Sequence, residues 1–228
     1  MKNVIKIVIT TFTLMLFTAC SLSLNEVQTN AAYYSFNDED TSLIINYNYV
    51  PEQIITYTNE QGGTLGFKVI ENETRKKEYR SRGTFSGGGG LLENYYDSKI
   101  IRFEIIENPS SEQYAKVNYI FSKNKDILTN GLNFPMWNVP LYSYIDEHQN
   151  SVNIFLKEYN ALPTSSLSIN GHLFNKVITI DSNSDQSTNN STFGPLTQNV
   201  NEIVYDYDFG IIQFKDINDT LWSLVYPQ

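Results

Sequence analysis

From residue 43 onward, the sequence alternates between short apolar segments and clusters of turn-forming residues. The apolar segments are rich in Tyr, Phe, Ile and Val, whose flat or branched side chains pack well on a pleated sheet. The pattern predicts strands over 43–50, 54–58, 64–71, 100–106, 114–121, 152–159, 167–180, 202–206, 210–214 and 221–226. We therefore expect residues 43–228 to form one mainly β domain with a mostly antiparallel sheet, which is an open curved sheet, a sandwich or a partial barrel.

Several connections between these segments also carry information. Residues 59–63 contain Asn and Gly, which tolerate the positive φ angles of tight turns, so a hairpin is expected between the second and third strands. Pro135 and Pro140 disfavour regular structure over 131–145. Residues 181–194 are rich in Ser, Asn and Asp and are expected to form a long exposed loop.

The strand over 114–121 has a helical alternative, because the chain over 111–121 would tolerate a helix. An apolar residue nevertheless falls at every second position, which is the period of a strand. These residues are Ala115, Val117, Tyr119 and Phe121. We therefore prefer the strand.

The first 20 residues have the three-part organisation of a bacterial secretory signal. Lys2 and Lys6 give a positive start, and the apolar run over 7–17 is too short to span a bilayer. The sequence Leu-Phe-Thr-Ala-Cys at 16–20 resembles the lipobox of bacterial lipoprotein precursors. That resemblance implies a signal peptide over 1–19 and acylation of Cys20, for example with palmitate, as the new N-terminus. A plain cleaved signal peptide is the alternative.

The residues that follow the signal fit a lipid-anchored chain. Cys20 is the only cysteine, so no intramolecular disulfide can form. Ser21 resembles the outer-membrane sorting pattern of such lipoproteins. Residues 20–42 are mostly polar and are expected to form the lipidated N-terminus and a flexible tether. Tyr33, Tyr34 and Phe36 within it could still pack on the folded domain.

The charge balance limits the partners of the mature chain. Cleavage before Cys20 leaves 209 residues and changes the formal charge from −9 to −11, because it removes Lys2 and Lys6 and no acidic residue. An acidic chain of this kind is not expected to bind nucleic acid or to adhere to anionic lipid through its net charge. The lipid on Cys20 is therefore expected to hold the protein at the membrane.

The last quarter of the chain carries a second resemblance. An Ile-Asn-Gly turn at 169–171 precedes a Tyr-rich segment at 204–209, a Gly-led apolar segment at 210–214 and a Leu-Trp-Ser-Leu segment at 221–224. This order resembles the C-terminal pattern of uncharacterised β-rich envelope lipoproteins of Gram-negative bacteria. The resemblance implies fold class and location and assigns no site residue.

Two motifs in the sequence begin like ion-binding or nucleotide-binding loops. Asp181, Asn183 and Asp185 match the start of an EF-hand, but Gln186 and Thr192 occupy the positions that need Gly and a bidentate Glu. A solvated loop is therefore expected, with a different kind of calcium site over 181–194 as the alternative. The glycines at 87–90 are followed by Leu-Leu-Glu, not by the Lys and Ser/Thr of a phosphate-binding loop, so a mobile connection is expected there.

Basic residues gather in one part of this acidic chain. The cluster consists of Arg75, Lys76, Lys77, Arg80 and Arg82. It could meet phosphate groups on envelope lipid or another acidic polymer. Charged side chains also keep an exposed strand edge from pairing with other chains, and we prefer this edge-strand interpretation.

Candidate catalytic residues are few. Asp206 with Asp208, or Glu52 with Glu60, could form the acid pair of a glycosidase, whose two carboxyl groups lie about 5 to 9 Å apart across a cleft. In a strand, Asp206 and Asp208 lie on one face, where two carboxylates are tolerated when solvated. No catalytic residue is assigned from this pattern.

The histidines and one tryptophan are also weighed. Neither His148 nor His172 has a second His at metal-ligand spacing, so no metal or cofactor is assigned. Trp137, next to Met136, could form an exposed platform for a glycan or peptide, but we favour a position as a lid on the core.

Taken together, the sequence predicts a membrane-anchored lipoprotein of the cell envelope, located at the outer membrane. We expect a non-enzymatic binding or structural module whose partner is a lipid, a glycan or a protein. The alternative is a surface polysaccharide hydrolase that uses a carboxylate pair. Calcium-dependent adhesion through 181–194 is a third hypothesis.

Overall fold

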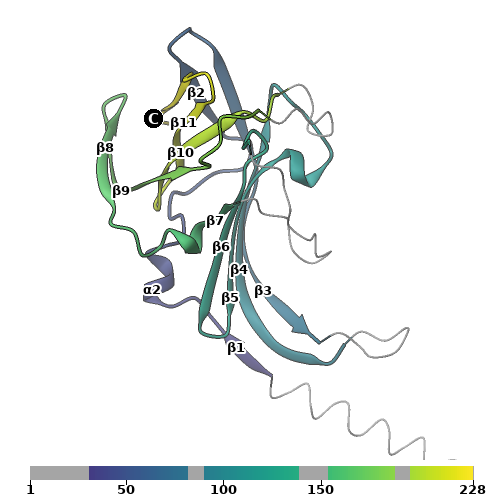
Figure 1. Cartoon of the computed structure of the whole chain (residues 1–228). Coiled ribbons are helices and arrows are strands. Elements are labelled where there is room, and N and C mark those ends of the chain that lie inside the picture. The colour runs from purple at the N-terminus through teal and green to yellow at the C-terminus, as the bar shows by residue number, and fades with distance from the viewer. Residues whose placement is uncertain (1–30, 82–89, 139–153, 188–195, 228) are drawn as a thin grey trace, which may run out of the picture. The chain divides into compact units, whose positions relative to one another are not determined.

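The computed structural model describes residues 31–81, 90–138, 154–187 and 196–227 (Figure 1). Strands make up 56% of it and helices 6%, which confirms the predicted mainly β class. The strands are β1 (Ala32–Tyr34), β2 (Ile54–Asn59), β3 (Thr64–Arg80), β4 (Leu92–Ile105), β5 (Val117–Asn124), β6 (Ile127–Asn133), β7 (Ile154–Phe155), β8 (Ser165–Ile169), β9 (His172–Asp181), β10 (Val200–Asp206), β11 (Gly210–Asp216) and β12 (Leu221–Val225). The helices are α2 (Asp38–Thr41) and the 3₁₀ turns η1 (Gln113–Ala115) and η2 (Leu156–Glu158). None of the helices in the described ranges has the length and hydropathy needed to cross a bilayer.

The strands form one sheet in the order β7-β6-β5-β4-β3-β2-β12-β11-β10-β9-β8, and β1 pairs in parallel with β4. The pairings described along this order are antiparallel, as predicted. The chain divides into two compact units, and β3 and β4 run through both of them. We call the smaller one the hairpin unit (residues 31–34, 76–81 and 90–96) and the larger one the β body (residues 35–75, 97–138, 154–187 and 196–227). The boundaries between the two units fall after Tyr34, Arg75 and Tyr96.

Within the β body, the sheet curls around its own aromatic core. Phe134, which follows β6, lies 5.3 Å from Phe214 on β11, ring centre to ring centre. Five strands separate β6 from β11 in the sheet order, so this contact requires the sheet to bend back on itself. Val200, at the start of β10, also exchanges backbone hydrogen bonds of 2.9 Å with Met136 and Asn138. The body is therefore an open half-barrel, one of the three architectures expected.

Tyrosine hydroxyls bind backbone groups inside this half-barrel. Tyr57 donates to the carbonyl of Ile211 (2.8 Å), and Tyr119 accepts from the backbone N–H of the same residue (2.9 Å). Tyr49 donates to the carbonyl of Phe209. These bonds tie β11 and the turn before it to β2, to β5 and to the segment around Tyr49, because a buried hydroxyl needs a partner.

We expect the buried tyrosines to stay protonated in the folded state above pH 10. Burial raises the pKa of four of them: Tyr49, Tyr57, Tyr119 and Tyr205. The unfolded chain can release these protons at its ordinary pKa of about 10, so stability is retained below that pH and is lost as the pH rises above it. A titration that records tyrosinate absorbance and circular dichroism together should show four tyrosines ionising only as the sheet unfolds. Their ionisation in the intact fold would contradict this prediction.

Six of the predicted strands are confirmed. These segments, 54–58, 64–71, 100–106, 202–206, 210–214 and 221–226, correspond to β2, β3, β4, β10, β11 and β12. The hairpin at 59–63 is also confirmed: Gly62 has φ of +82°, and the Asn59 side chain accepts a hydrogen bond of 2.6 Å from the backbone of Gly63. The segment at 114–121 begins as η1 and becomes β5 at Val117, so the helical alternative is limited to one short turn.

The strand predicted over 43–50 is wrong. Ile44, Ile45 and Tyr49 are buried, as their apolar character predicts, but the backbone there forms turns and irregular structure. The N–H groups of Asn46 and Tyr47 both donate to the carbonyl of Asp208, at 3.1 and 2.9 Å. The segment therefore packs across the end of the half-barrel and does not pair along a strand.

Other segments differ in extent. The prediction over 152–159 is wrong for most of its length, because the described part contains β7 and then η2. The segment 167–180 is a hairpin of two strands, since Asn170 and Gly171 adopt φ of +49° and +84° and reverse the chain. Strand β6 was not predicted.

The expected tether is partly folded. Within 20–42, β1 pairs with β4, and α2 begins at an Asn37 capping box. Residues 1–30, and with them the signal peptide and Cys20, lie outside the described residues, as do Arg82, residues 87–89, His148 and residues 188–194 of the predicted loop.

Candidate functional site

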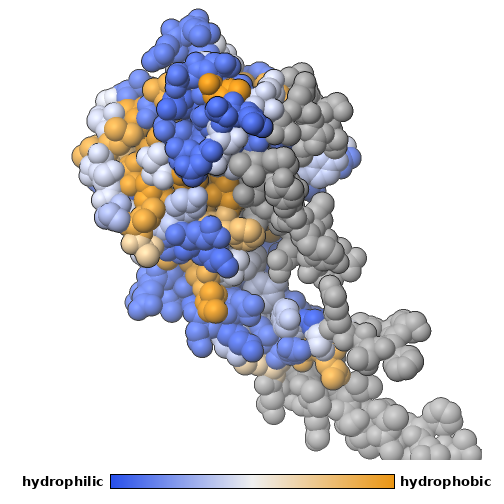
Figure 2. All heavy atoms as spheres, viewed as in Figure 1, coloured by the Kyte–Doolittle hydropathy of each residue, from blue (hydrophilic) through white to orange (hydrophobic). Residues whose placement is uncertain are grey.

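A pocket of about 140 Å³ lies in the β body where the β8–β9 turn, the β10–β11 turn, residues 46–47 and the C-terminal segment meet. Its lining residues are Asn46, Tyr47, His172, Leu173, Phe174, Asn175, Asp206, Asp208, Phe209 and Tyr226. On the face shown in Figure 2, apolar residues gather on the side of the β body that carries β8 and β9. Leu173, which is 56% exposed, brings this apolar character to the pocket.

Asp206 holds the turn that forms one wall of the pocket. Its carboxylate accepts hydrogen bonds from the backbone N–H groups of Lys176 (3.0 Å), Asp208 (2.9 Å) and Phe209 (3.0 Å). Short polar side chains commonly fix turns in this way. The side chain is 2% exposed, and both of its oxygens accept these bonds. Asp206 therefore has a structural role in this arrangement.

Asp208 presents a more accessible carboxylate to the pocket. Its Oδ1 accepts from the ammonium of Lys176 at 2.8 Å and from the side-chain amide of Asn46 at 2.9 Å. The Asp208 and Lys176 side chains are 36% and 40% exposed, so solvent screens this ion pair. Asn46 and Asp208 together place an amide and a carboxylate at the pocket rim.

Aromatic rings form much of the pocket surface. The rings of His172 and Tyr226 stack in parallel, with centres 3.5 Å apart and an angle of 8° between their planes. Tyr47 lies edge-on to Tyr226 at 6.1 Å and 4.7 Å from Phe209. Burial, together with the neighbouring Tyr47 and Asp206, raises the pKa of Tyr226 above its ordinary value.

This arrangement suits a small, neutral, polyhydroxylated ring. Aromatic faces pack against its C–H groups, while amide, carboxylate and hydroxyl groups at the rim bind its hydroxyls. The volume lies well below the roughly 300 to 1,000 Å³ of typical small-molecule sites, so the pocket fits one unit of a larger molecule. No Lys or Arg is among the described residues that line it, which makes an anionic group a poor match.

Of the two predicted carboxylate pairs, one lies in a single pocket and the other is far apart in the structure. Asp206 and Asp208 do meet at one pocket, although Asp206 is occupied by backbone donors. Glu52 and Glu60 lie beyond opposite ends of β2, a six-residue strand, and are therefore separated by about 20 Å. Glu52 instead lies 3.6 Å from the ammonium of Lys68.

Trp137 and the calcium-like loop do not form sites within the described part of the chain. Trp137 is 4% exposed and lies in the core beside Val200, so the interpretation as a core lid is correct. Asp181 accepts a hydrogen bond of 2.7 Å from the backbone of Asn183, which forms a local turn. Among the described residues, no group of three or more His, Cys, Asp or Glu side chains could hold a metal ion.

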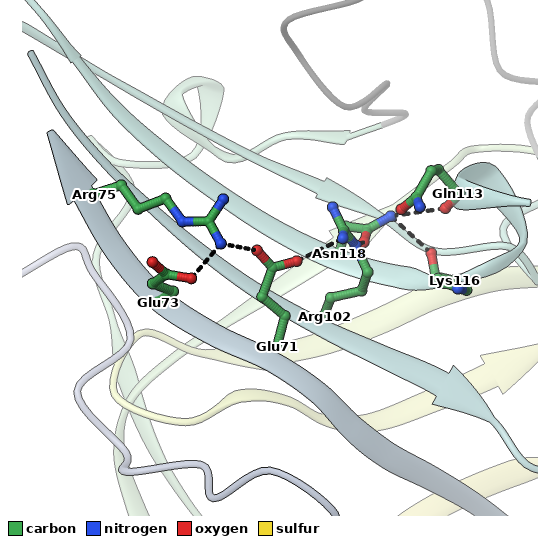
Figure 3. Close-up of polar contacts among 7 residues, drawn as sticks. All are labelled: Glu71, Glu73, Arg75, Arg102, Gln113, Lys116 and Asn118. Atoms are coloured by element: carbon green, nitrogen blue, oxygen red, sulfur yellow. Dashed lines mark hydrogen bonds and ion pairs between the residues drawn. The ribbon is translucent and has the colours of Figure 1, made fainter. Parts of the chain in front are cut away.

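The basic cluster is divided between the two units, and Arg75 belongs to the β body. Figure 3 shows Arg75 between Glu71 and Glu73, and Glu71 also binds Arg102. The hydrogen bond from Arg75 lowers the pKa of Glu73 and raises that of Arg75. Arg75 is therefore neutralised by its neighbours.

Arg102 and Asn118 continue this network across the sheet (Figure 3). The guanidinium of Arg102 donates to the Asn118 side chain at 2.7 Å. The Asn118 amide then donates to the backbone carbonyls of Gln113 (3.0 Å) and Lys116 (3.1 Å). The network ties β3, β4 and β5 to the η1 turn, which is a structural function.

Sequence reasoning missed several pocket residues. Tyr47, Asn46 and Tyr226 were not singled out, because they lie more than 100 residues from His172 or at the far end of the chain. The only usable signal was the Tyr-Asp-Tyr-Asp-Phe run at 205–209, whose alternating acids formed one of the candidate pairs. Comparisons with models of known protein families, with curated proteins and with solved structures find no match for this chain.

Proposed function

We propose that this protein is a lipoprotein of the cell envelope, anchored through Cys20, and that it acts as a non-enzymatic binding module. Its pocket would hold one sugar ring of an envelope glycan. The observation that carries this proposal is the stacked His172–Tyr226 pair beside the polar rim of Asn46 and Asp208.

Glycan is favoured over the other ligand classes by the size and charge of the pocket. A lipid chain needs a long apolar cavity, whereas this pocket is about 140 Å³ and carries two carboxylates. A phosphate-bearing ligand would meet the Asp208 carboxylate and would find no Lys or Arg among the described residues that line the pocket. A neutral sugar ring avoids both problems.

A binding role is favoured over hydrolysis by the state of Asp206. A glycosidase needs one carboxyl group that can give up a proton and a second that acts as base or nucleophile. Asp206 accepts three backbone N–H bonds, which occupy both of its carboxylate oxygens and fix its position in the turn. Such a group is poorly suited to deliver a proton.

The proposal is tested by calorimetric titration of the full chain in detergent with glucose, galactose, mannose and N-acetylglucosamine. At least one of these sugars should bind, and His172→Ala should weaken its binding by roughly 3- to 10-fold, because one aromatic contact contributes about 0.5 to 1.5 kcal/mol. The matched control is Phe155→Ala, which removes an aromatic ring that is 40% exposed and does not line the pocket. Equal binding by wild type and His172→Ala, or no binding of any of the sugars, would contradict the proposal.

A further inference from the structure

The hairpin unit carries a charge opposite to that of the rest of the chain. Its described residues contain three basic residues, Lys76, Lys77 and Arg80, and two acidic ones, Glu78 and Glu93, a formal charge of +1. The segments 35–75 and 97–228 contain 22 acidic and 10 basic residues, a formal charge of −12. The chain as a whole is acidic, but its hairpin unit is basic.

The same unit exposes large aromatic and apolar side chains. Tyr33 is 50% exposed, Tyr79 is 46% exposed and Leu91 is 63% exposed. Tyr33 shares a face with Lys76, whose ammonium lies 4.5 Å from the centre of its ring. Tyr79 lies on the opposite face, because it is three residues from Lys76 along β3. Both faces of the hairpin unit therefore carry an exposed tyrosine.

Aromatic rings also position the basic side chains. The Lys76 ammonium lies over Tyr95 at 4.1 Å as well as over Tyr33, and it stays exposed. Arg80 binds Glu78 at 2.7 Å and is 42% exposed in its side chain. Tyrosine rings beside lysine and arginine are the side chains that proteins place at the level of lipid head groups.

We propose that the hairpin unit inserts among the anionic lipid head groups of the membrane to which Cys20 is anchored. This inference rests on the proposed anchoring. Only eleven residues separate Cys20 from Ala32, the first residue of β1, so an acylated Cys20 keeps β1 within about 40 Å of the bilayer. The occupant is a membrane surface because exposed tyrosines lie on both faces of the unit, Tyr33 on β1 and Tyr79 on β3, as insertion between head groups requires.

The anchor and the hairpin unit then have different roles. A net charge of +1 is too small to hold an acidic protein on a membrane by itself, since each basic residue contributes only modestly at an anionic surface. Once acyl chains hold the protein at the bilayer, the hairpin is at high effective concentration there, and weak contacts suffice to engage it. The acyl chains would keep the protein at the membrane, and the hairpin unit would set how the protein is oriented on the membrane surface.

The test uses the full chain, purified from bacterial membranes and reconstituted into vesicles of brominated phosphatidylglycerol and phosphatidylethanolamine. The reporter is Tyr79→Trp, and the native Trp137 and Trp222 supply the background measured in the wild type. We expect bromine to quench the added tryptophan. Lys76→Glu with Lys77→Glu in the reporter chain should lower the insertion equilibrium by roughly tenfold.

The matched control is Lys125→Glu with Lys157→Glu, which makes the same charge change at two exposed lysines of the β body and should leave quenching unchanged. Intact mass and vesicle flotation of the same samples report acylation and anchoring. An unacylated Cys20 would overturn both proposals, whereas acylated, floating protein with no quenching of the added tryptophan would overturn the hairpin proposal alone. A mass in detergent that falls from dimer to monomer in the Lys76→Glu, Lys77→Glu chain would identify a second acidic copy as the occupant and would also overturn it.

Discussion

Replacing Cys20 with serine is expected to release the protein from the membrane almost completely. The proposed anchor depends on acyl chains attached to this thiol, and serine cannot take the thioether-linked lipid. Each buried methylene contributes about 0.8 kcal/mol to membrane binding, so several long chains give stable anchoring where one chain alone is marginal. Membrane fractionation of cells that express either chain should show wild type in the pellet and the Cys20→Ser chain in the soluble exported fraction.

A neighbouring substitution separates the lipid from general effects on export. Ser21→Ala changes the next residue and keeps the thiol, so we expect this chain to remain in the membrane pellet and to keep the mass of the acyl chains. An unacylated Cys20 in the wild type would instead identify a plain cleaved signal peptide. Cys20→Ser protein that sediments with membranes to the same extent as wild type would show that the anchor lies elsewhere.

The second large effect is expected at the buried ion pair between Lys123 and Asp40. The Lys123 ammonium lies 2.8 Å from Asp40 Oδ2 and 3.0 Å from Oδ1, and both residues are 5% exposed. Asp40 also completes the capping box that begins α2, where it accepts a hydrogen bond of 2.9 Å from the backbone of Asn37. The pair thus connects the segment that leaves the tether to the end of β5.

Lys123→Met is expected to lower the free energy of unfolding by about 3 to 5 kcal/mol, because it leaves the Asp40 carboxylate buried without its cation. Urea unfolding followed by tryptophan fluorescence measures this as a lower midpoint with an unchanged slope. Lys125→Met is the matched control, since Lys125 is exposed and lies two residues further along the chain, and its effect should stay within about 0.5 kcal/mol. A loss below about 1 kcal/mol for Lys123→Met would show that the ion pair does not hold α2 in place.

The C-terminal meander was predictable because its signals are local. The segments that become β10, β11 and β12 are each rich in β-favouring residues and are separated by short turns. Gly210, with φ of +104°, marks the β10–β11 turn in the sequence as well as in the structure. A hypothetical Cβ at this glycine would lie 2.8 Å from the Tyr119 hydroxyl, so the tight contact across the core also needs this residue.

The structure of the segment 43–50 and of strand β6 could not be predicted from local sequence signals. Apolar residues at 44, 45 and 49 report burial, but they do not report which backbone groups the segment binds. In β6, Asn130 and Asn133 are buried, and the Asn133 amide donates to the carbonyls of Tyr114 and Lys116. Buried polar residues that bind distant backbone groups interrupt the apolar alternation by which a strand is predicted from sequence. Such a strand is therefore missed.

The pocket was only partly predictable for a related reason. Asp206 and Asp208 were candidates because they stand together in the sequence, and they do share a pocket. Asn46, His172 and Tyr226 reach it from three distant parts of the chain. The strand order β12-β11-β10-β9 brings His172 and Tyr226 beside the β10–β11 turn, and Asn46 binds Asp208 in that turn. The spacing of residues in the sequence does not predict that these distant residues line one pocket.

The most direct test of the proposed binding role follows the imidazole signals of the two histidines by nuclear magnetic resonance. His172 lies in the pocket, and His148 is the only other histidine in the sequence. The His172→Ala chain identifies which signals belong to the pocket. Titration with the sugars named above should shift the His172 signals saturably. If no sugar shifts the His172 signals, the pocket is not a glycan site.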